Sequence, residues 1–147
     1  MRRLLPITLF LVALAAIARL DSSLPVVRVV GWPWRLAALV PMIISGAMIA
    51  LAARALREAR TTVKPFKRPT SLVTHGVYRI SRNPMYLAMI LILAGAALFA
   101  GSISPWAVVL IFAILMDRLV VVPEEATLEQ AFGDEFLRYR RKVRRWI

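Results

Sequence analysis

The stretch that decides the fold is THGVYRISRNPMYLAMILILAGAALFA, residues 74–100. Its first part is polar and basic, and its second part is apolar from Met85 to about Ala100. Asn83 followed by Pro84 is typical of a helix start, with the asparagine as N-cap and the proline in the first turn. The apolar part approaches the length of about 20 residues that crosses a bilayer core, where a helix satisfies its own backbone. The stretch therefore predicts a membrane helix with a polar, basic entrance.

Three further apolar spans have similar lengths: Leu4 to about Ala18, about Leu36 to Ala53, and Pro105 to Val122. Of the 147 residues, 60% are hydrophobic, which exceeds the share in soluble domains. We predict an all-α integral membrane protein with four transmembrane helices and a C-terminal interfacial amphipathic helix. The chain is expected to form one domain, in which residues 1–62 carry the first two spans and residues 63–147 form the functional core.

The first span also resembles a signal peptide. It has a basic start, an apolar middle and the small-residue pattern Ala16-Ile17-Ala18. An uncleaved first helix is the preferred interpretation, and a cleaved signal peptide is the alternative.

The formal net charge is +12, and its distribution predicts the orientation. Lys and Arg residues precede the first span, fill the connection between the second and third spans, and crowd the C-terminus, whereas the turn Gly101–Ser104 has none. The positive-inside rule places both termini in the cytoplasm, in the bacterial inner membrane as the expected location, with Trp32–Trp34 as an aromatic anchor on the other side. Anionic membrane lipids, and not nucleic acid, are the expected partners of these charges.

Cysteine is absent and His75 is the only histidine. The first fact excludes disulfides, thiolate metal sites and cysteine nucleophiles. The second argues against a multi-histidine metal site and a Ser-His-Asp triad, so no metal is predicted.

A second polar block, PEEATLEQAFGDEFLRYRRKVRRWI, covers residues 123–147. Pro123 is expected to kink or restart the helix, which places Glu124 and Glu125 at a helix start where the dipole stabilises carboxylates. Gly133 is expected to end this helix, and Asp134 to cap the next one. The last helix carries a basic face opposite an apolar stripe, the pattern of a helix in the membrane interface: Phe136, Tyr139, Val143 and Trp146.

Both blocks have a structural and a functional interpretation. Arg82 and the dipole of the following helix form a seat for a carboxylate or phosphate, or the segment is a capped helix anchored in headgroups. Glu124 or Glu125 is expected to pair with Arg82 or Arg118, or to receive a cationic ligand. Asp117 and Arg118 are expected to form an ion pair, or to snorkel together toward the membrane interface.

Together, LVTHGVYRISRNPMYL and the second block resemble the isoprenylcysteine carboxyl methyltransferase and phospholipid methyltransferase superfamily. These integral-membrane enzymes use S-adenosylmethionine. The resemblance covers about Val63 to Ile147. It rests on a Gly-x-Tyr-Arg turn, an Arg-x-Pro-x-Tyr helix start, a Glu-Glu pair leading to Leu and Phe-Gly, and a Tyr with a terminal Arg-Trp. Asn83 stands where the isoprenylcysteine branch usually has histidine and many bacterial relatives have asparagine.

The resemblance implies S-adenosylmethionine as the cofactor. Arg82 and the helix start at Asn83 suit its carboxylate, and Glu124 or Glu125 suits its ammonium or ribose. Arg82 and Glu125 are the predicted catalytic residues, because methyl transfer depends on positioning and electrostatics more than on a nucleophile. The predicted cofactor-binding residues are His75, Gly76, Tyr78, Arg82, Asn83, Pro84, Tyr86, Glu124, Glu125 and Tyr139.

The methyl acceptor is expected to be lipophilic, such as an isoprenylcysteine-like carboxylate or a lipid amine or thiol, and to enter laterally from the inner leaflet. Two other functions are compatible with the sequence. One is an NADPH-dependent membrane reductase of the sterol-reductase type, which bound NADPH would select. The other is a non-enzymatic membrane subunit, which a failure to bind any cofactor would favour.

Overall fold

The computed structural model describes residues 4–24, 26–61 and 70–147. The basic residues Arg2, Arg3, Lys64, Lys67 and Arg68, which contribute to the predicted orientation, lie outside the described residues.

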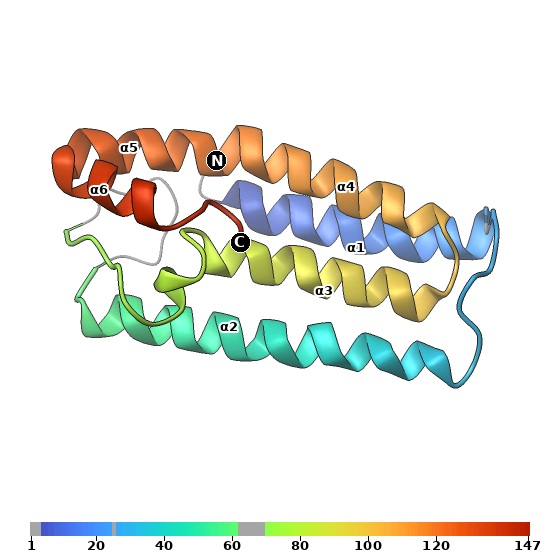
Figure 1. Ribbon diagram of the computed structural model, residues 1–147. Coiled ribbons are helices and arrows are strands. Elements are labelled where there is room, and N and C mark those ends of the chain that lie inside the picture. The colour runs from blue at the N-terminus through green and yellow to red at the C-terminus, as the bar shows by residue number, and fades with distance from the viewer. Residues whose placement is uncertain (1–3, 25, 62–69) are drawn as a thin grey trace.

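Helices make up the fold, and the described residues contain no strand (Figure 1). A short 3-10 helix, η2 (Trp34–Ala38), precedes the second long helix, and another, η3 (Gly76–Arg79), precedes the third. The all-α class is therefore confirmed. The helices are α1 (Leu5–Ser23), η2 (Trp34–Ala38), α2 (Leu39–Glu58), η3 (Gly76–Arg79), α3 (Pro84–Ala100), α4 (Ser104–Met116), the π-helical η4 (Asp117–Val121), α5 (Val122–Phe132) and α6 (Asp134–Lys142).

The four helices α1 to α4 lie side by side in an elongated bundle, and α3 contacts each of the other three (Figure 1). The core lies between α1, α3 and α4, where the rings of Phe10 and Phe112 meet edge to face. Small side chains allow the helices to approach closely. A Cβ atom at Gly95 of α3 would come 2.8 Å from Cγ of Met42 on α2.

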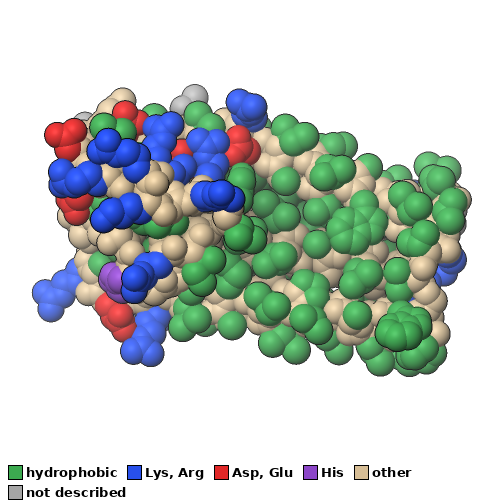
Figure 2. Space-filling model, in the orientation of Figure 1, with side chains coloured by type: hydrophobic (Ala, Val, Ile, Leu, Met, Phe, Trp, Pro, Cys, Tyr) green, Lys and Arg blue, Asp and Glu red, His purple; other side chains and the backbone are tan. Residues whose placement is uncertain are grey.

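Within the described part of the chain, three helical stretches are long and apolar enough to cross a membrane: Leu5–Ser23, Trp34–Glu58 and Ser104–Phe132. The apolar α3 is shorter, with 17 residues. Apolar side chains cover most of the length of the bundle on the face shown in Figure 2. An integral membrane protein with three to four spanning helices is supported, whereas a fourth crossing by α3 and an interfacial position for α6 stay predictions.

One local expectation about the second block is wrong and another is met. Pro123, Glu124 and Glu125 lie in the first turn of α5, as expected, although Ser104–Phe132 runs on as one helical stretch through the π-helical turn Asp117–Val121. The wider turn accommodates a residue that lacks an N–H and whose ring crowds the preceding turn. Asp134 is not the cap of α6, since Gly133 occupies the N-cap position. Gly133 has φ +49° and ends α5, as expected.

The connection from α1 to α2 closes the end of the bundle opposite α5 and α6. The N–H groups of Val29 and Val30 donate to the carbonyl of Gly101, at 2.8 and 3.1 Å. Gly101 has φ +82°, and a Cβ atom there would lie 2.5 Å from the carbonyl oxygen of Val30, so only glycine fits this turn. Trp32 and Trp34 are exposed in the same connection.

Candidate functional site

Most charged side chains gather at one end of the bundle (Figure 2). Three segments meet there: residues 75–83 before α3, the stretch from η4 into α5, and α6 with the tail that follows it (Figure 1). These segments contain both of the polar blocks that the sequence analysis singled out. The fold therefore brings the two blocks together.

The start of α3 lies at Asn83 and Pro84, as the sequence pattern predicts, and a serine supports it from the preceding segment. Asn83 occupies the N-cap position, but its side chain makes no capping hydrogen bond. The buried Ser81 accepts a hydrogen bond from the N–H of Asn83 at 3.1 Å and donates one to the carbonyl of Arg145 at 3.0 Å. Among the described residues, Nδ2 of Asn83 is the one buried side-chain nitrogen or oxygen without a hydrogen-bond partner.

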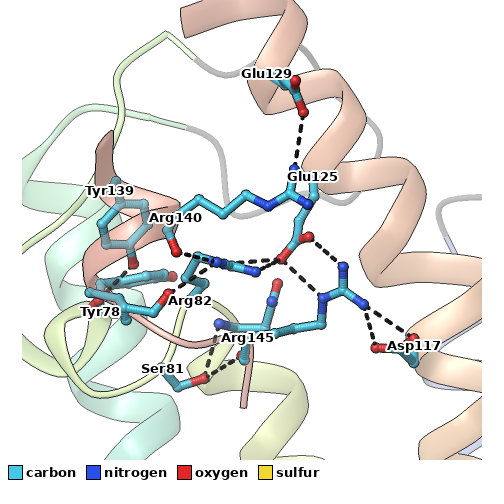
Figure 3. A network of polar contacts seen from close by, with 11 residues as sticks. Tyr78, Ser81, Arg82, Asp117, Glu125, Glu129, Tyr139, Arg140 and Arg145 are labelled. Carbon is cyan, nitrogen blue, oxygen red and sulfur yellow. Dashed lines mark hydrogen bonds and ion pairs between the residues drawn. The ribbon is translucent and has the colours of Figure 1, made fainter. Parts of the chain in front are cut away.

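An ion-pair network joins the start of α3, α5 and the C-terminal tail (Figure 3). Nε and Nη2 of Arg82 donate to Oε1 of Glu125, at 3.1 and 2.8 Å. Arg145 donates to both oxygens of the same carboxylate, at 3.2 and 2.7 Å. Nη1 of Arg145 also contacts both carboxylate oxygens of Asp117, at 3.0 and 3.3 Å. Arg82 thus pairs with Glu125, one of the two partners that the sequence allowed.

Arg82 also fastens the tail, since its Nη1 donates to the carbonyls of Arg140 and Val143, each at 3.0 Å. The side chains of Arg82 and Glu125 are only 8% and 7% exposed. A carboxylate at that depth is costly without cationic partners, which explains why two guanidinium groups surround it.

Arg145 is a site residue that the sequence analysis did not select. The expected partner of Asp117 was Arg118, yet Arg118 lies 3.8 Å away and Arg145 lies at 3.0 Å. The one sequence signal for Arg145 was that it is the arginine of the terminal Arg-Trp motif shared with the family. Spacing along the chain did not reveal it, because Glu125 and Arg145 are 20 residues apart.

The predicted tyrosines lie beside this network. Tyr86 donates its hydroxyl to Oε1 of Glu124 at 2.9 Å, and Tyr139 donates its hydroxyl to the backbone carbonyl of Tyr78 at 2.6 Å. Burial raises the pKa of Tyr78 and Tyr139 above the ordinary value, so both phenols are neutral at physiological pH. Gly76, at φ +61°, starts the turn before Tyr78, as expected.

Three other predicted cofactor-binding residues, Pro84, His75 and Gly76, do not take part in the ion-pair network. Pro84 is buried in the first turn of α3. His75 and Gly76 are exposed at the start of η3, which packs against α2. The apolar stripe of α6 faces the protein in its first half, since Phe136 and Tyr139 are buried and their rings meet edge to face.

The donor set matches a small polar molecule that carries both positive and negative charge. Asn83 offers an unpaired amide donor at a helix start, where the dipole favours an anionic group. Glu124 of α5, whose Oε1 accepts the hydrogen bond from Tyr86 of α3, offers a carboxylate for a cationic group or a hydroxyl. A buried donor without a partner is unusual in a folded protein, and a bound ligand is one way to satisfy it.

Comparison with known proteins gives three findings. The family model described as phospholipid methyltransferase matches residues 34–135, which include α2 to α5 and the first two residues of α6. An uncharacterized protein of Haemophilus influenzae is 43% identical over 63 residues, which are 43% of this chain and the whole of that protein. No solved structure matches.

Proposed function

The chain belongs to the phospholipid methyltransferase family, and from this premise we propose that it transfers a methyl group from S-adenosylmethionine to a lipophilic acceptor. A membrane methyltransferase follows from the family and from the apolar helices. The cofactor, the acceptor and the site residues are our proposal. We further propose one domain, in which residues 1–62 add two spans to a core of residues 63–147.

One observation carries the proposal: the ion pair between Arg82 and Glu125 joins two segments 43 residues apart. The sequence neighbours of this pair are Asn83 and Glu124. The pair therefore fixes the start of α3, with its unpaired amide, relative to the carboxylate of Glu124 on α5.

We assign roles on this basis. Asn83 would bind the carboxylate of the cofactor, and Glu124 its ammonium or ribose, with Tyr78, Tyr86 and Tyr139 as the aromatic and hydroxyl surroundings. Arg82 and Glu125 form an ion pair with each other, so we propose that they act by holding Asn83 and Glu124 in position. When bound, S-adenosylmethionine supplies a methyl group on a positively charged sulfur, and the protein's part is to orient it and exclude water.

The polar end is proposed to face the cytoplasm, in the inner membrane, with both termini on that side. The exposed basic residues of α6 and the tail would then contact anionic headgroups: Arg138, Arg140, Arg141, Lys142 and Arg144. A polar cofactor would enter from the cytoplasm, whereas a lipophilic acceptor would reach the same end through the surrounding bilayer.

We expect the purified protein to bind S-adenosylhomocysteine, the product form of the cofactor, and not NADPH. Titration calorimetry with each compound on the full chain in detergent measures this directly. Saturable heat with NADPH alone would select the reductase alternative. A flat response to both compounds would favour a non-enzymatic subunit and would contradict the proposal.

Replacing the unpaired amide separates binding from folding. Asn83→Leu should weaken S-adenosylhomocysteine binding about tenfold, the effect of one lost hydrogen bond to a charged group. The thermal midpoint of the free protein should stay the same or rise, because a buried donor without a partner is removed. The matched control is Gln130→Leu, which changes an exposed amide on α5. A lower midpoint with unchanged affinity would make Asn83 a structural residue only.

A further inference from the structure

An arginine interrupts an apolar stripe on the outer face of the fourth long helix. Leu110, Ile114 and Arg118 follow one another at intervals of four residues and therefore share a face. Leu110 and Ile114 are 65% and 61% exposed, and the Arg118 side chain is 76% exposed. Val122, four residues after Arg118, is also exposed, so this face is apolar on both sides of the guanidinium along the helix.

The position of Arg118 along the helix places it near the edge of the membrane. Arg118 is fourteen residues beyond Ser104, where α4 begins. At a rise of 1.5 Å per residue this is about 21 Å, within the roughly 30 Å of a hydrocarbon core. The antiparallel α3 begins at Pro84, so Arg118 lies about level with its first turn. An exposed guanidinium at such a level is costly unless it reaches an anionic group.

Asp117 provides only part of the negative charge that Arg118 needs. Asp117 is 3.8 Å from Arg118, and it already receives two shorter contacts from Arg145. Among the described residues, the guanidinium groups of Arg82 and Arg145 face the carboxylates of Asp117 and Glu125 (Figure 3), and Arg118 joins this cluster through Asp117. Three guanidinium groups and two carboxylates leave this cluster with one net positive charge. Arg118 has the most exposed side chain of the three arginines.

A groove of about 460 Å³ lies at this point. Its wall combines apolar side chains with the charged pair and an indole from the C-terminal tail: Ala113, Ile114, Asp117, Arg118 and Trp146. Tryptophan is typical of the membrane interface, where the ring contacts apolar chains and its N–H contacts polar groups.

We infer that this groove binds one anionic phospholipid, with its phosphate on Arg118 and an acyl chain along Ile114 and Leu110. The planar guanidinium matches a phosphate with two parallel hydrogen bonds, and the charge left over in the cluster favours an anionic headgroup over a zwitterionic one. This site does not rest on the proposed methyl transfer, and its contacts lie on the opposite side of Arg145 from Glu125.

Trp146 is a reporter inside the groove. The chain has four tryptophans, so the triple variant Trp32→Phe, Trp34→Phe, Trp106→Phe leaves Trp146 as the only one. This protein is reconstituted in phosphatidylcholine vesicles that contain increasing fractions of phosphatidylglycerol with brominated acyl chains, which quench nearby indoles. We expect quenching to saturate at a lower fraction of brominated phosphatidylglycerol than of brominated phosphatidylcholine, by about tenfold.

The variants decide whether Arg118 carries this preference. Arg118→Gln should abolish it, and Arg54→Gln should leave it intact, because Arg54 is equally exposed at 76% but pairs with Glu58 on α2. Soluble glycerol phosphate should not relieve the quenching, which separates a lipid from a free phosphate. Native mass spectrometry of the unmodified protein should show one retained phosphatidylglycerol, lost in Arg118→Gln.

Two results would overturn the inference. One is equal quenching of Trp146 by the two brominated lipids. The other is an equal loss of preference in Arg118→Gln and Arg54→Gln, which would mean general surface charge. Neither result bears on S-adenosylhomocysteine binding, so failure of this inference and failure of the proposed function are distinguishable.

Discussion

Replacing Arg82 by alanine is expected to weaken S-adenosylhomocysteine binding by about ten- to a hundredfold, the equivalent of about 1.5–3 kcal/mol. The substitution removes both donors that Arg82 gives to Glu125 and both that it gives to the carbonyls of Arg140 and Val143. The start of α3 is then no longer tied to α5. Asn83 and Glu124, which carry the proposed binding contacts, lose their fixed separation.

The same change should lower stability, so binding must be measured apart from unfolding. Removing one partner of a buried ion pair costs about 3–5 kcal/mol, although Arg145 still faces Glu125 in this variant. Affinity is therefore measured by calorimetry well below the thermal midpoint of each variant. Arg82→Lys keeps the charge but loses the forked geometry, so its affinity should lie between those of the parent and Arg82→Ala.

Two companion variants complete this test. Arg138→Ala removes an exposed arginine from α6 and should leave the affinity unchanged. Glu125→Gln keeps the shape of the side chain and removes its charge, and it should weaken binding as Arg82→Ala does. If Arg82→Ala and Glu125→Gln both bind S-adenosylhomocysteine like the parent, the ion pair serves the fold alone.

The second large effect is expected from the length of the acceptor. Shortening an acceptor chain by about five methylene groups should lower kcat/KM by about a thousandfold, because each buried methylene contributes about 0.8 kcal/mol. The physical reason is the position of the proposed site. The polar cluster adjoins the apolar belt of the bundle, so an acceptor held in the bilayer arrives there concentrated and oriented (Figure 2).

The measurement uses matched pairs of methyl acceptors. Prenylated thiols, fatty acids and lipid amines are each tested beside a short-chain analogue with the same reacting group, at equal total concentration. KM should rise far more than kcat falls, since the lost contacts are the same before and during reaction. If short, water-soluble analogues react as efficiently as long-chain forms, lateral entry is wrong and the membrane merely localises the enzyme.

Several features of this protein were predictable from the sequence because they depend on neighbouring residues. Long apolar runs predict helices in a membrane protein, and each apolar helix observed overlaps a predicted span. Pro84 marks the start of α3, Gly133 the end of α5 and Gly76 the turn before Tyr78, because each satisfies a local demand on backbone dihedrals. The resemblance to the family also rested on order and spacing within the chain, and the family match confirms it.

Local patterns failed where the outcome depended on which segments meet. Asn83 is the N-cap of α3, as expected, but its side chain makes no capping hydrogen bond, and Ser81, which binds the carbonyl of Arg145, accepts the N–H of Asn83. The amphipathic pattern of α6 predicted a membrane-facing stripe, yet Phe136 is fully buried by protein. An apolar helix face indicates only that the face is shielded from water. The pattern does not show whether lipid or the interior of the same chain shields it.

The candidate site depends mostly on which segments meet in the fold. The sequence by itself determined that two polar blocks flank apolar helices and that arginines and glutamates stand at the helix starts. Only the tertiary structure decided that Glu125 binds Arg82 and Arg145 together and that Asp117 prefers Arg145 to its neighbour Arg118. Hydrophobic length is a property summed along a segment, whereas an ion pair depends on a distance of a few ångströms between segments that packing alone sets.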